Sequence, residues 1–307
     1  MVEMKLPNQR QTFWKKIKAE KVLYFMILPT IIYFLVFRVF PIYNMRLAFF
    51  KYSSRESWTF VGLKYFRMIF KSPDFRQILK NTLTISFMKY VLLFPAFPIF
   101  AIMLNEVRWK GLKNSVQIIS YLPHFLSWIV IAGIWISTLS IDGGGFNQII
   151  GWFGIKPISF MTENRYIKWV LFFCEGWRSL GWDSIIYFTA ILTINPSLYE
   201  AAEIDGANRW QLIKNIILPA LIIPMVTMFI LNLGFFLNAG FDQVLNFSNN
   251  AVLSSIDILD TYIYRIGIQG GQYSLATAVS LIKGVVGVLL VLGTHFTSKK
   301  LTGKGVW

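Results

Sequence analysis

The chain has 307 residues, of which 55% are hydrophobic, 17% aromatic and 15% charged. An average soluble domain carries about 25% charged residues, so this composition excludes an ordinary water-soluble protein and also a disordered or fibrous one. One cysteine and two histidines exclude a disulfide framework and a metal centre built from these residues. The net charge is +15, and the basic residues lie largely between apolar runs. This distribution predicts contact with the headgroups of a lipid bilayer and no binding of nucleic acid.

Six apolar runs are long enough to cross a hydrocarbon core of about 30 Å, which takes roughly 20 helical residues. The runs are continuous and do not alternate with a period of two, so they predict helices and not transmembrane strands. We therefore predict an all-α integral membrane protein with six transmembrane helices in one domain, 22–297, between a basic cytoplasmic tail, 1–21, and a short tail, 298–307. The predicted spans are 22–42, 82–104, 116–139, 167–193, 216–237 and 275–296.

The distribution of Lys and Arg predicts the orientation, because short basic loops stay preferentially in the cytoplasm. With both termini inside, the two tails hold six and three basic residues and the two inner loops hold three and two, against three in all in the outer loops 140–166 and 238–274. The loop 43–81 is an exception, with eight basic residues on the outside. Its apolar residues recur at helical spacing over 63–71, which predicts a short helix at the membrane interface.

The loop between the fourth and fifth runs, 195–215, contains strong signals of local structure. Asn195 can cap a helix whose first turn contains Pro196. Ser197 and Glu200 have the spacing of a capping box. A helix is therefore predicted to begin at this point.

Gly206 can adopt the positive φ that ends this helix, and a second short helix is predicted to lead to Pro219. Two short helices joined at a bend would then hang from the membrane domain on the cytoplasmic side. Ala201 and Ala202 leave the backbone open to close approach by another protein, and Glu200 offers a charge to it. This pattern is typical of a docking element.

The same loop resembles the signature of the membrane permeases of binding-protein-dependent ABC importers. The match consists of Glu-Ala-Ala, three residues, Gly, nine residues, Ile, one residue and Leu-Pro. The resemblance implies a type I ABC importer permease fold in which the loop 195–215 forms a cytoplasmic coupling helix. The residues that it assigns to ATPase coupling are Glu200, Ala201, Ala202, Asp205, Gly206, Ile216, Leu218 and Pro219.

Further segments are similar to the carbohydrate-uptake branch of this family, and in particular to polysaccharide permeases of the LplB type. The coupling loop contributes Glu-Ala-Ala-x-Ile-Asp-Gly-Ala at 200–207, and the resemblance as a whole covers roughly residues 25–307. The other segments are Tyr121–Trp128, Gly240–Val244, Asp260–Arg265 and Gly305–Trp307.

The resemblance also implies a set of partners. They are a second, related permease that completes a heterodimer, two copies of a cytoplasmic ABC ATPase and an extracellular solute-binding lipoprotein, in the cytoplasmic membrane of a bacterium. The chain would then be no enzyme and would hold no cofactor, because ATP and Mg would be bound by the partner ATPase. Its glycine-rich segment 143–145 lacks the Gly-Lys-Ser/Thr that a phosphate-binding loop needs.

Charged side chains inside spans usually face a bundle interior or a water-filled cavity. Glu175 and Arg178, three residues apart, either neutralise one another or line a pathway. Asp183 and Lys283 have no partner of opposite sign three or four residues away on their own helix. The charged residues within or near the spans are Arg38, Lys89, Glu175, Arg178, Asp183 and Lys283.

Sugars bind proteins through aromatic faces and through amide or carboxylate groups that bond their hydroxyls. At helical spacing Asn232, Phe235, Phe236 and Ala239 share a face that could line a pathway, although aromatic stripes in spans also pack against other helices or lipid. Cationic residues in the pathway would suit an acidic sugar, but the sequence is at least as consistent with a neutral oligosaccharide as the substrate. The candidate pathway residues are Trp177, Arg178, Trp182, Asp183, Tyr187, Asn232, Phe235, Phe236, Asn238 and Lys283.

We therefore predict a permease subunit of an ATP-driven importer for oligosaccharides, which forms half of the translocation pathway. One alternative is a proton-coupled secondary transporter with a relay through Asp183 and Lys283, and ATP dependence of uptake separates the two. A membrane-embedded enzyme is a further alternative, but the sequence lacks a convincing nucleophile–base pair or metal cluster.

Overall fold

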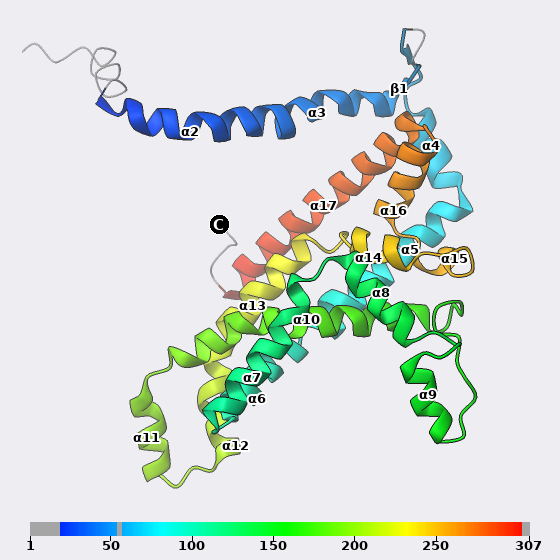
Figure 1. Cartoon of the computed structure of the whole chain (residues 1–307). Helices are drawn as coiled ribbons and strands as arrows, with labels where there is room; N and C mark the ends of the chain where they lie inside the picture. The colour runs from blue at the N-terminus through cyan, green and yellow to red at the C-terminus, as the bar shows by residue number, and fades with distance from the viewer. Residues whose placement is uncertain (1–18, 54–56, 303–307) are drawn as a thin grey trace, which may run out of the picture.

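The computed structural model describes residues 19–53 and 57–302, with side chains up to residue 296. Most of the predicted N-terminal tail and the segment Gly305–Trp307 lie outside the described residues. The described chain is almost wholly helical (Figure 1). A short antiparallel ladder of β1 (Phe50–Lys51) and β2 (Thr59–Phe60) is an addition to the predicted all-α fold.

Several of the helices follow one another with little or no interruption, through π-helical or 3₁₀ segments. These segments are Leu35–Val39, Met45–Phe49, Met88–Leu92, Leu122–Phe125, Ile213–Ile217 and Arg265–Gln269. The α-helices are α2 (Lys21–Phe34), α3 (Phe40–Asn44), α4 (Lys64–Lys71), α5 (Pro73–Phe87), α6 (Ala96–Glu106), α7 (Lys110–Tyr121), α8 (Trp128–Thr138), α9 (Gly145–Trp152), α10 (Ile167–Leu192), α11 (Pro196–Ile204), α12 (Arg209–Leu212), α13 (Leu218–Gly234), α14 (Phe241–Phe247), α15 (Leu253–Ile256), α16 (Leu259–Tyr264) and α17 (Tyr273–Thr302).

Four continuous helices in the described part of the chain are long and apolar enough to cross a membrane. They contain or overlap the first, second, fifth and sixth predicted runs. Their bounds are Lys21–Phe49, Pro73–Glu106, Arg209–Gly234 and Tyr273–Phe296.

The predicted span at 116–139 is not one continuous helix. Two helical pieces, Lys110–Phe125 and Trp128–Thr138, pass the same test only together and are bent by 108°. Ser127 between them is extended, and its hydroxyl caps α8 by accepting a hydrogen bond from the backbone N–H of Val130 at 3.4 Å. A capping residue starts a new helix with its own axis, which the apolar composition of this stretch does not reveal.

Helix α10 lies at the centre of the packing. It contacts α6, α7 and α13, and it contributes to two of the buried apolar clusters, through Leu171 and Cys174 in one and Tyr187 in the other. Its 26 residues are enough to cross a bilayer. It also carries Lys168, Glu175, Arg178 and Asp183, and this charge makes it less apolar than the four continuous helices.

The first long helix, Lys21–Phe49, stands apart from the other helices. The apolar window of this helix has no buried residues, and Figure 1 shows it leaving the bundle from the corner where β1 lies. Over residues 22–42 its large apolar side chains are exposed on all sides, with exposed fractions from 43% at Val39 to 75% at Phe25. A helix that is apolar all round needs lipid or another protein around it.

A third apolar cluster joins α4, α5, α16 and α17 at the same corner, with Ile69 and Val279 at its centre. Helix α4 confirms the prediction of a short helix over 63–71. A polar contact fastens α5 to the end of α15, because the amide of the fully buried Asn81 donates to the carbonyl oxygens of Ser254 at 2.9 Å and Asp257 at 3.2 Å. Buried amides are stable only with such partners.

Candidate functional site

The elbow formed by α11 and α12 carries the first part of the signature, from Glu200 to Gly206, and local capping determines its shape. The side chain of Asn195 accepts from the backbone N–H of Ser197 at 3.0 Å, which confirms the predicted start of α11. The predicted capping box of Ser197 and Glu200 is wrong. A capping box occurs at the second helix instead, where Asn208 and Gln211 each accept from the other's backbone N–H at 3.0 and 2.7 Å.

Gly206 ends α11 as predicted. Its φ is +75°, in the left-handed region that side chains with a Cβ rarely adopt. The N–H of Ala207 donates to the carbonyl oxygen of Ala202 at 2.9 Å, and the N–H of Gly206 donates to that of Glu203 at 3.1 Å. These bonds satisfy carbonyl groups that the end of the helix would otherwise leave unpaired.

The second short helix is not separate, which corrects the predicted pair of short helices. Helix α12 runs through the π-helical segment Ile213–Ile217 into α13, so that one continuous helix covers Arg209–Gly234. Pro219 lies in the first turn of α13 and has no N–H to donate to the preceding turn, which favours the wider π-helical register before it. The signature residues Ile216, Leu218 and Pro219 therefore lie on the helix that enters the membrane domain.

One side of the elbow is open to a partner. Ile204 is 87% exposed, Trp210 68% and Leu198 52%, and Glu200 and Ala201 are exposed beside them. Large apolar side chains grouped with charges on a surface indicate a contact site for another protein.

The other side of the elbow is fastened to the membrane domain. Tyr199 and Ile213 pack against the buried cluster around α10. Arg209 forms an ion pair with Glu106 at the end of α6, with 2.7 Å between Nη1 and Oε2. Burial and then the charge of Glu106 raise the pKa of Tyr199 above its ordinary value, so this side chain stays neutral.

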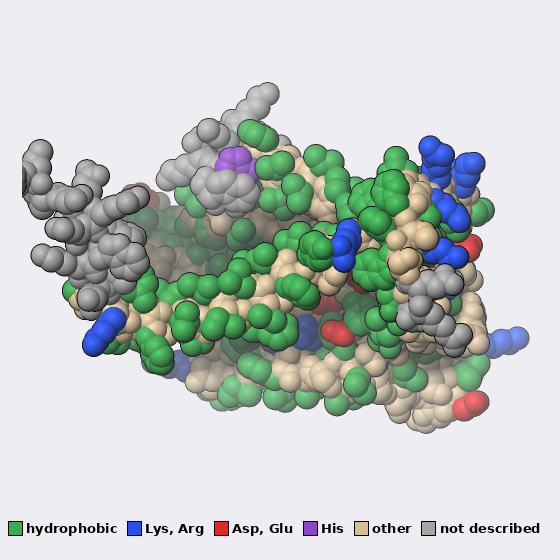
Figure 2. All heavy atoms as spheres, turned by 90° about the horizontal axis from the view of Figure 1, so that it is seen from above, with side chains coloured by type: hydrophobic (Ala, Val, Ile, Leu, Met, Phe, Trp, Pro, Cys, Tyr) green, Lys and Arg blue, Asp and Glu red, His purple; other side chains and the backbone are tan. Residues whose placement is uncertain are grey.

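A polar pocket of about 200 Å³ lies where α6, α8, α10 and α13 meet. Apolar and aromatic walls surround a small group of charged and amide side chains, and this combination is typical of ligand sites. In the surface view, charged side chains lie in a recess near the centre of one face (Figure 2). The residues that line the pocket are Lys89, Tyr90, Leu93, Phe94, Phe97, Trp128, Glu175, Arg178, Ser179, Asp183, Asn232, Asn238 and Gly240.

Lys89 and Glu175 form a buried ion pair in this pocket, with 2.9 Å between Nζ and Oε2 and side chains only 6% and 17% exposed. Lys89 also donates to the carbonyl oxygen of Ala239 at 2.8 Å, and Glu175 accepts from the hydroxyl of Ser179 at 3.0 Å. The structure therefore pairs Glu175 with Lys89, and not with Arg178 on its own helix. The signal for this in the sequence was a lysine within a span, which needs a counter-charge.

Gly240 allows this pairing. A Cβ at this position would lie 2.4 Å from the Nζ atom of Lys89, and its φ of +97° again favours glycine. The backbone after α13 can thus approach the ammonium group closely enough for the carbonyl oxygen of Ala239 to accept its hydrogen bond.

Arg178 and Asp183 line the same pocket with spare bonding capacity. The guanidinium donates through Nη2 to the carbonyl oxygen of His124 at 3.3 Å and lies 4.7 Å from the ring of Trp128. Its buried Nε has no hydrogen-bond partner among the described residues. In the same part of the chain, no hydrogen bond or ion pair involves the carboxylate of Asp183.

Only some of the candidate residues in or just after the predicted fifth span reach the polar pocket. Asn232 and Asn238 line the pocket, while Phe235 is 60% exposed. The predicted helical face of Asn232, Phe235, Phe236 and Ala239 is wrong, because α13 ends at Gly234.

Lys283 has a partner on a neighbouring helix. Its ammonium group lies 2.5 Å from a carboxylate oxygen of Asp260 on α16 and donates to Asn238 at 2.7 Å. The sequence offers Lys283 no opposite charge three or four residues away on its own helix, and the structure supplies one from Asp260 in the segment Asp260–Arg265. Arg265 in that segment forms an ion pair with the buried Asp257.

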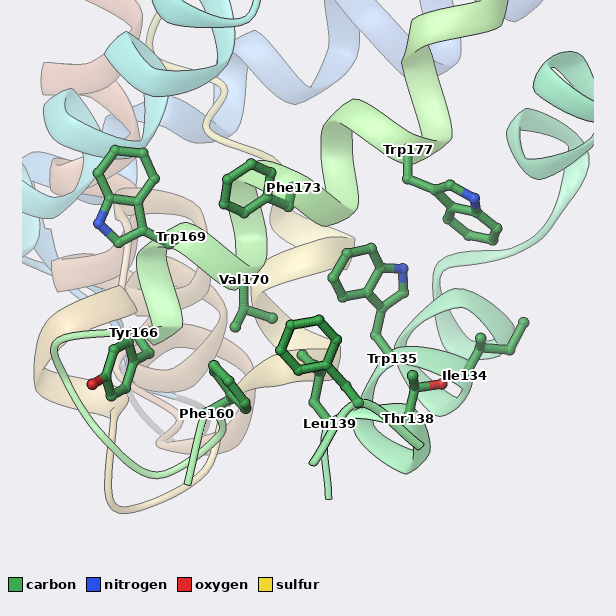
Figure 3. Close-up of a pocket in the computed structure, with 11 residues that line it drawn as sticks. Ile134, Trp135, Thr138, Leu139, Phe160, Tyr166, Trp169, Val170, Phe173 and Trp177 are labelled. Atoms are coloured by element: carbon green, nitrogen blue, oxygen red, sulfur yellow. The ribbon is translucent and has the colours of Figure 1, made fainter. Parts of the chain in front are cut away.

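The remaining aromatic candidates lie outside the polar pocket. Trp182 stacks on His124 with 4.3 Å between ring centroids, and Tyr187 is 1% exposed in the apolar core. Trp177 lines a second, larger pocket of about 740 Å³, shown in Figure 3, where its ring lies 6.3 Å from that of Trp135. The pathway roles of these residues stay predictions.

The fold and the pocket define a class of protein: a mostly helical membrane protein with a polar pocket between its helices. The model of the family described as "Binding-protein-dependent transport system inner membrane component" matches residues 80–298. The match covers more than half of the chain, and the chain therefore belongs to this family.

Several known proteins are similar along nearly the whole chain. Protein LplB of Bacillus subtilis (strain 168) is 36% identical over 296 residues, which are 95% of this chain and 92% of LplB. The polygalacturonan/rhamnogalacturonan transport system permease protein YteP of the same strain is 36% identical, covering 98% of this chain and 94% of YteP.

A solved structure is equally similar. It is that of a bacterial ABC transporter involved in the import of the acidic polysaccharide alginate, and a chain in it superposes with a TM-score of 0.88 at 36% identity, covering 95% of this chain and 99% of that one. A bacterial alginate ABC transporter in complex with alginate pentasaccharide-bound periplasmic protein is also similar, with a chain at 37% identity and a TM-score of 0.88.

Lys89→Met is expected to destabilise the protein by about 3–5 kcal/mol, because it leaves the charge of Glu175 buried without its partner. Lys89→Met combined with Glu175→Met is expected to cost less than the single change, since no charge is then left alone. Thermal unfolding of the purified variants in detergent measures both effects. Equal or larger losses in the double variant would show that the pair is not the source of the stability.

Gly240→Ala is expected to displace the ammonium group of Lys89, because the new methyl group needs the space that this group occupies. The variant should lower the midpoint of thermal unfolding, whereas Gly145→Ala, where nothing lies within 4 Å of the added carbon, should leave it nearly unchanged. Equal midpoints for both variants would contradict the assigned role of Gly240.

Proposed function

We propose that the chain is a permease subunit of an ATP-driven, binding-protein-dependent importer for oligosaccharides, and that it forms half of the translocation pathway. The relatives named above support the substrate class. The observation that carries the proposal is the elbow. The capped helix α11 bends at Gly206 into the helix that begins with α12, and this bend is open to a partner on one side and fastened to the membrane domain on the other.

In this proposal the elbow docks onto a cytoplasmic ATPase, which binds ATP and Mg, and α11 is the coupling helix. A coupling element must pass on a displacement without deforming, and three connections suit this role. The elbow continues into α13, follows directly from α10 and is tied to α6 by Glu106 and Arg209. Closure of the ATPase would thereby move α6, α10 and α13, which are three of the four helices that border the polar pocket.

The polar pocket is the proposed place where sugar passes. Asp183, Asn232 and Asn238 offer acceptors and donors for hydroxyl groups, and Trp128 and Phe94 offer aromatic surface. A second, related permease would supply the other wall of the pathway, and an extracellular solute-binding lipoprotein would deliver the sugar.

We further propose six spans in a bacterial cytoplasmic membrane, with α10 among them and both termini inside. The charged side chains of α10 at Glu175, Arg178 and Asp183 line the pocket and so avoid lipid. This placement explains how α10 can cross the membrane although it is less apolar than the other spans. The elbow then lies in the cytoplasm.

A proton-coupled secondary transporter is less well supported. A relay through Asp183 and Lys283 would need these groups to exchange protons, but Lys283 is engaged with Asp260 and Asn238. The elbow would also have no role in such a transporter.

Gly206→Pro and Glu200→Lys are expected to leave membrane insertion intact and to abolish ATPase binding. The first change removes the backbone conformation at the bend, since proline cannot adopt a φ of +75°, and the second reverses a charge at the proposed contact. Co-purification of the ATPase with the tagged chain measures the effect. Asp142→Lys, a charge reversal at an exposed site in another loop, serves as the control. Undiminished co-purification with both elbow variants would count against the coupling assignment.

Single-cysteine labelling tests the orientation. Cys174 is the one cysteine of the chain and is 0% exposed, so the unmodified protein is expected to remain unlabelled by a membrane-impermeant maleimide. Ser197→Cys should react only when the cytoplasmic face is accessible, and Asp142→Cys should react in intact cells. The reverse pattern would overturn the proposed orientation.

A further inference from the structure

The exposed face of α4 is unusual because it gathers cations where the charge rule for membrane proteins predicts few. The stretch 43–81 carries eight basic residues. Three of them, Lys64, Arg67 and Lys71, recur at helical spacing and line a groove of about 380 Å³ together with Val61, Leu63 and Met68. Figure 2 shows basic side chains grouped at this corner of the molecule.

These three cations are exposed and form no ion pair with the residues that the structure describes. The ion pairs within 19–53 and 57–296 involve other residues, and none includes Lys64, Arg67 or Lys71. Three like charges side by side on one helix repel one another, so an isolated helix of this pattern is disfavoured. A bound anion would relieve this repulsion.

The opposite face of α4 holds the cations in place. Ile69 is 2% exposed in the cluster with α5 and α17, and the ring of Phe66 lies 5.4 Å from that of Phe49. Because this face is packed, the basic face cannot rotate away, and a ligand there would not have to order the helix.

The position of α4 along the membrane normal is given by its neighbours. It packs against the segment that ends the first long helix at Phe49, against α5, which begins at Pro73, and against α17, which begins at Tyr273. Three candidate spans begin or end there, so α4 lies at the boundary between hydrocarbon and water. Basic side chains at this depth meet lipid phosphate groups.

Apolar side chains border the groove. Leu63 is 56% exposed, Met68 49% and Phe70 58%, and Phe60 on the adjoining ladder is 71% exposed. A helix with a basic face and exposed apolar residues beside it is typical of helices that lie in the membrane interface. The apolar residues can contact acyl chains while the cations contact the headgroup.

From this arrangement we infer that the groove of Lys64, Arg67 and Lys71 binds the headgroup of an anionic phospholipid. The arginine contributes a planar fork to the phosphate and the two lysines contribute point charges. The bound headgroup neutralises the basic stretch and fastens the corner where the first long helix leaves the bundle. This site is independent of the proposed transport function.

Native mass spectrometry of the purified full-length protein, with its co-purifying partners, tests the site. The probe is dioleoyl phosphatidylglycerol, with dioleoyl phosphatidylcholine as the neutral reference. The variant Lys64→Gln/Arg67→Gln/Lys71→Gln is compared with Lys51→Gln/Arg76→Gln/Lys80→Gln, which removes the same charge from neighbouring positions outside the groove. The groove variant is expected to bind phosphatidylglycerol roughly tenfold or more weakly, given the attraction of each basic residue to an anionic lipid, while the control changes little.

A charge-preserving variant, Lys64→Arg/Lys71→Arg, is expected to retain the preference for phosphatidylglycerol, which separates loss of the site from loss of folding. Equal losses in the groove and control variants would overturn the inference, because they would reduce it to total charge. Unchanged lipid binding in the groove variant, with or without lost association of a solute-binding protein, would overturn it as well.

Discussion

The ion pair of Lys89 and Glu175 is the contact on which the arrangement of the membrane domain depends. A lone charge among apolar helices costs several kcal/mol, so each group requires the other, and their contact fixes the segment after α5 against α10. The carbonyl oxygen of Ala239 adds the backbone beyond α13, which Gly240 allows to come close. One buried pair thereby sets the relative position of three helices and forms one wall of the polar pocket.

Helix α10 connects the two halves of the proposed mechanism. Near its middle it contributes Glu175, Arg178 and Asp183 to the pocket, and just beyond its end Asn195 begins the elbow. The elbow also continues into α13, which ends beside the pocket. In the proposed mechanism, movement at the exposed elbow would reach the pocket through packed helices, which is what coupling of hydrolysis to transport requires.

The parts of the structure that depend on local chemistry could be predicted, and those that depend on distant partners could not. Asn195 and Gly206 predicted the ends of α11 because capping involves only neighbouring residues. The sequence does not reveal the partner of Glu175, because Lys89 is remote from it along the chain. Nor does it reveal the bend before Trp128, because the hydropathy of a segment says nothing about the direction of its helix axis. The segments Tyr121–Trp128, Gly240–Val244 and Asp260–Arg265 prove to hold this bend, the close approach to Lys89 and the partner of Lys283.

The central claim is that this chain works as one subunit of an ATP-driven importer. The most direct measurement is gentle purification of the tagged chain from its native membrane, with mass-spectrometric identification of every protein that stays bound. The account predicts an ABC ATPase and a second, related permease in stable association with the chain. Reproducible absence of both, together with transport by the chain alone under a proton gradient, would contradict it.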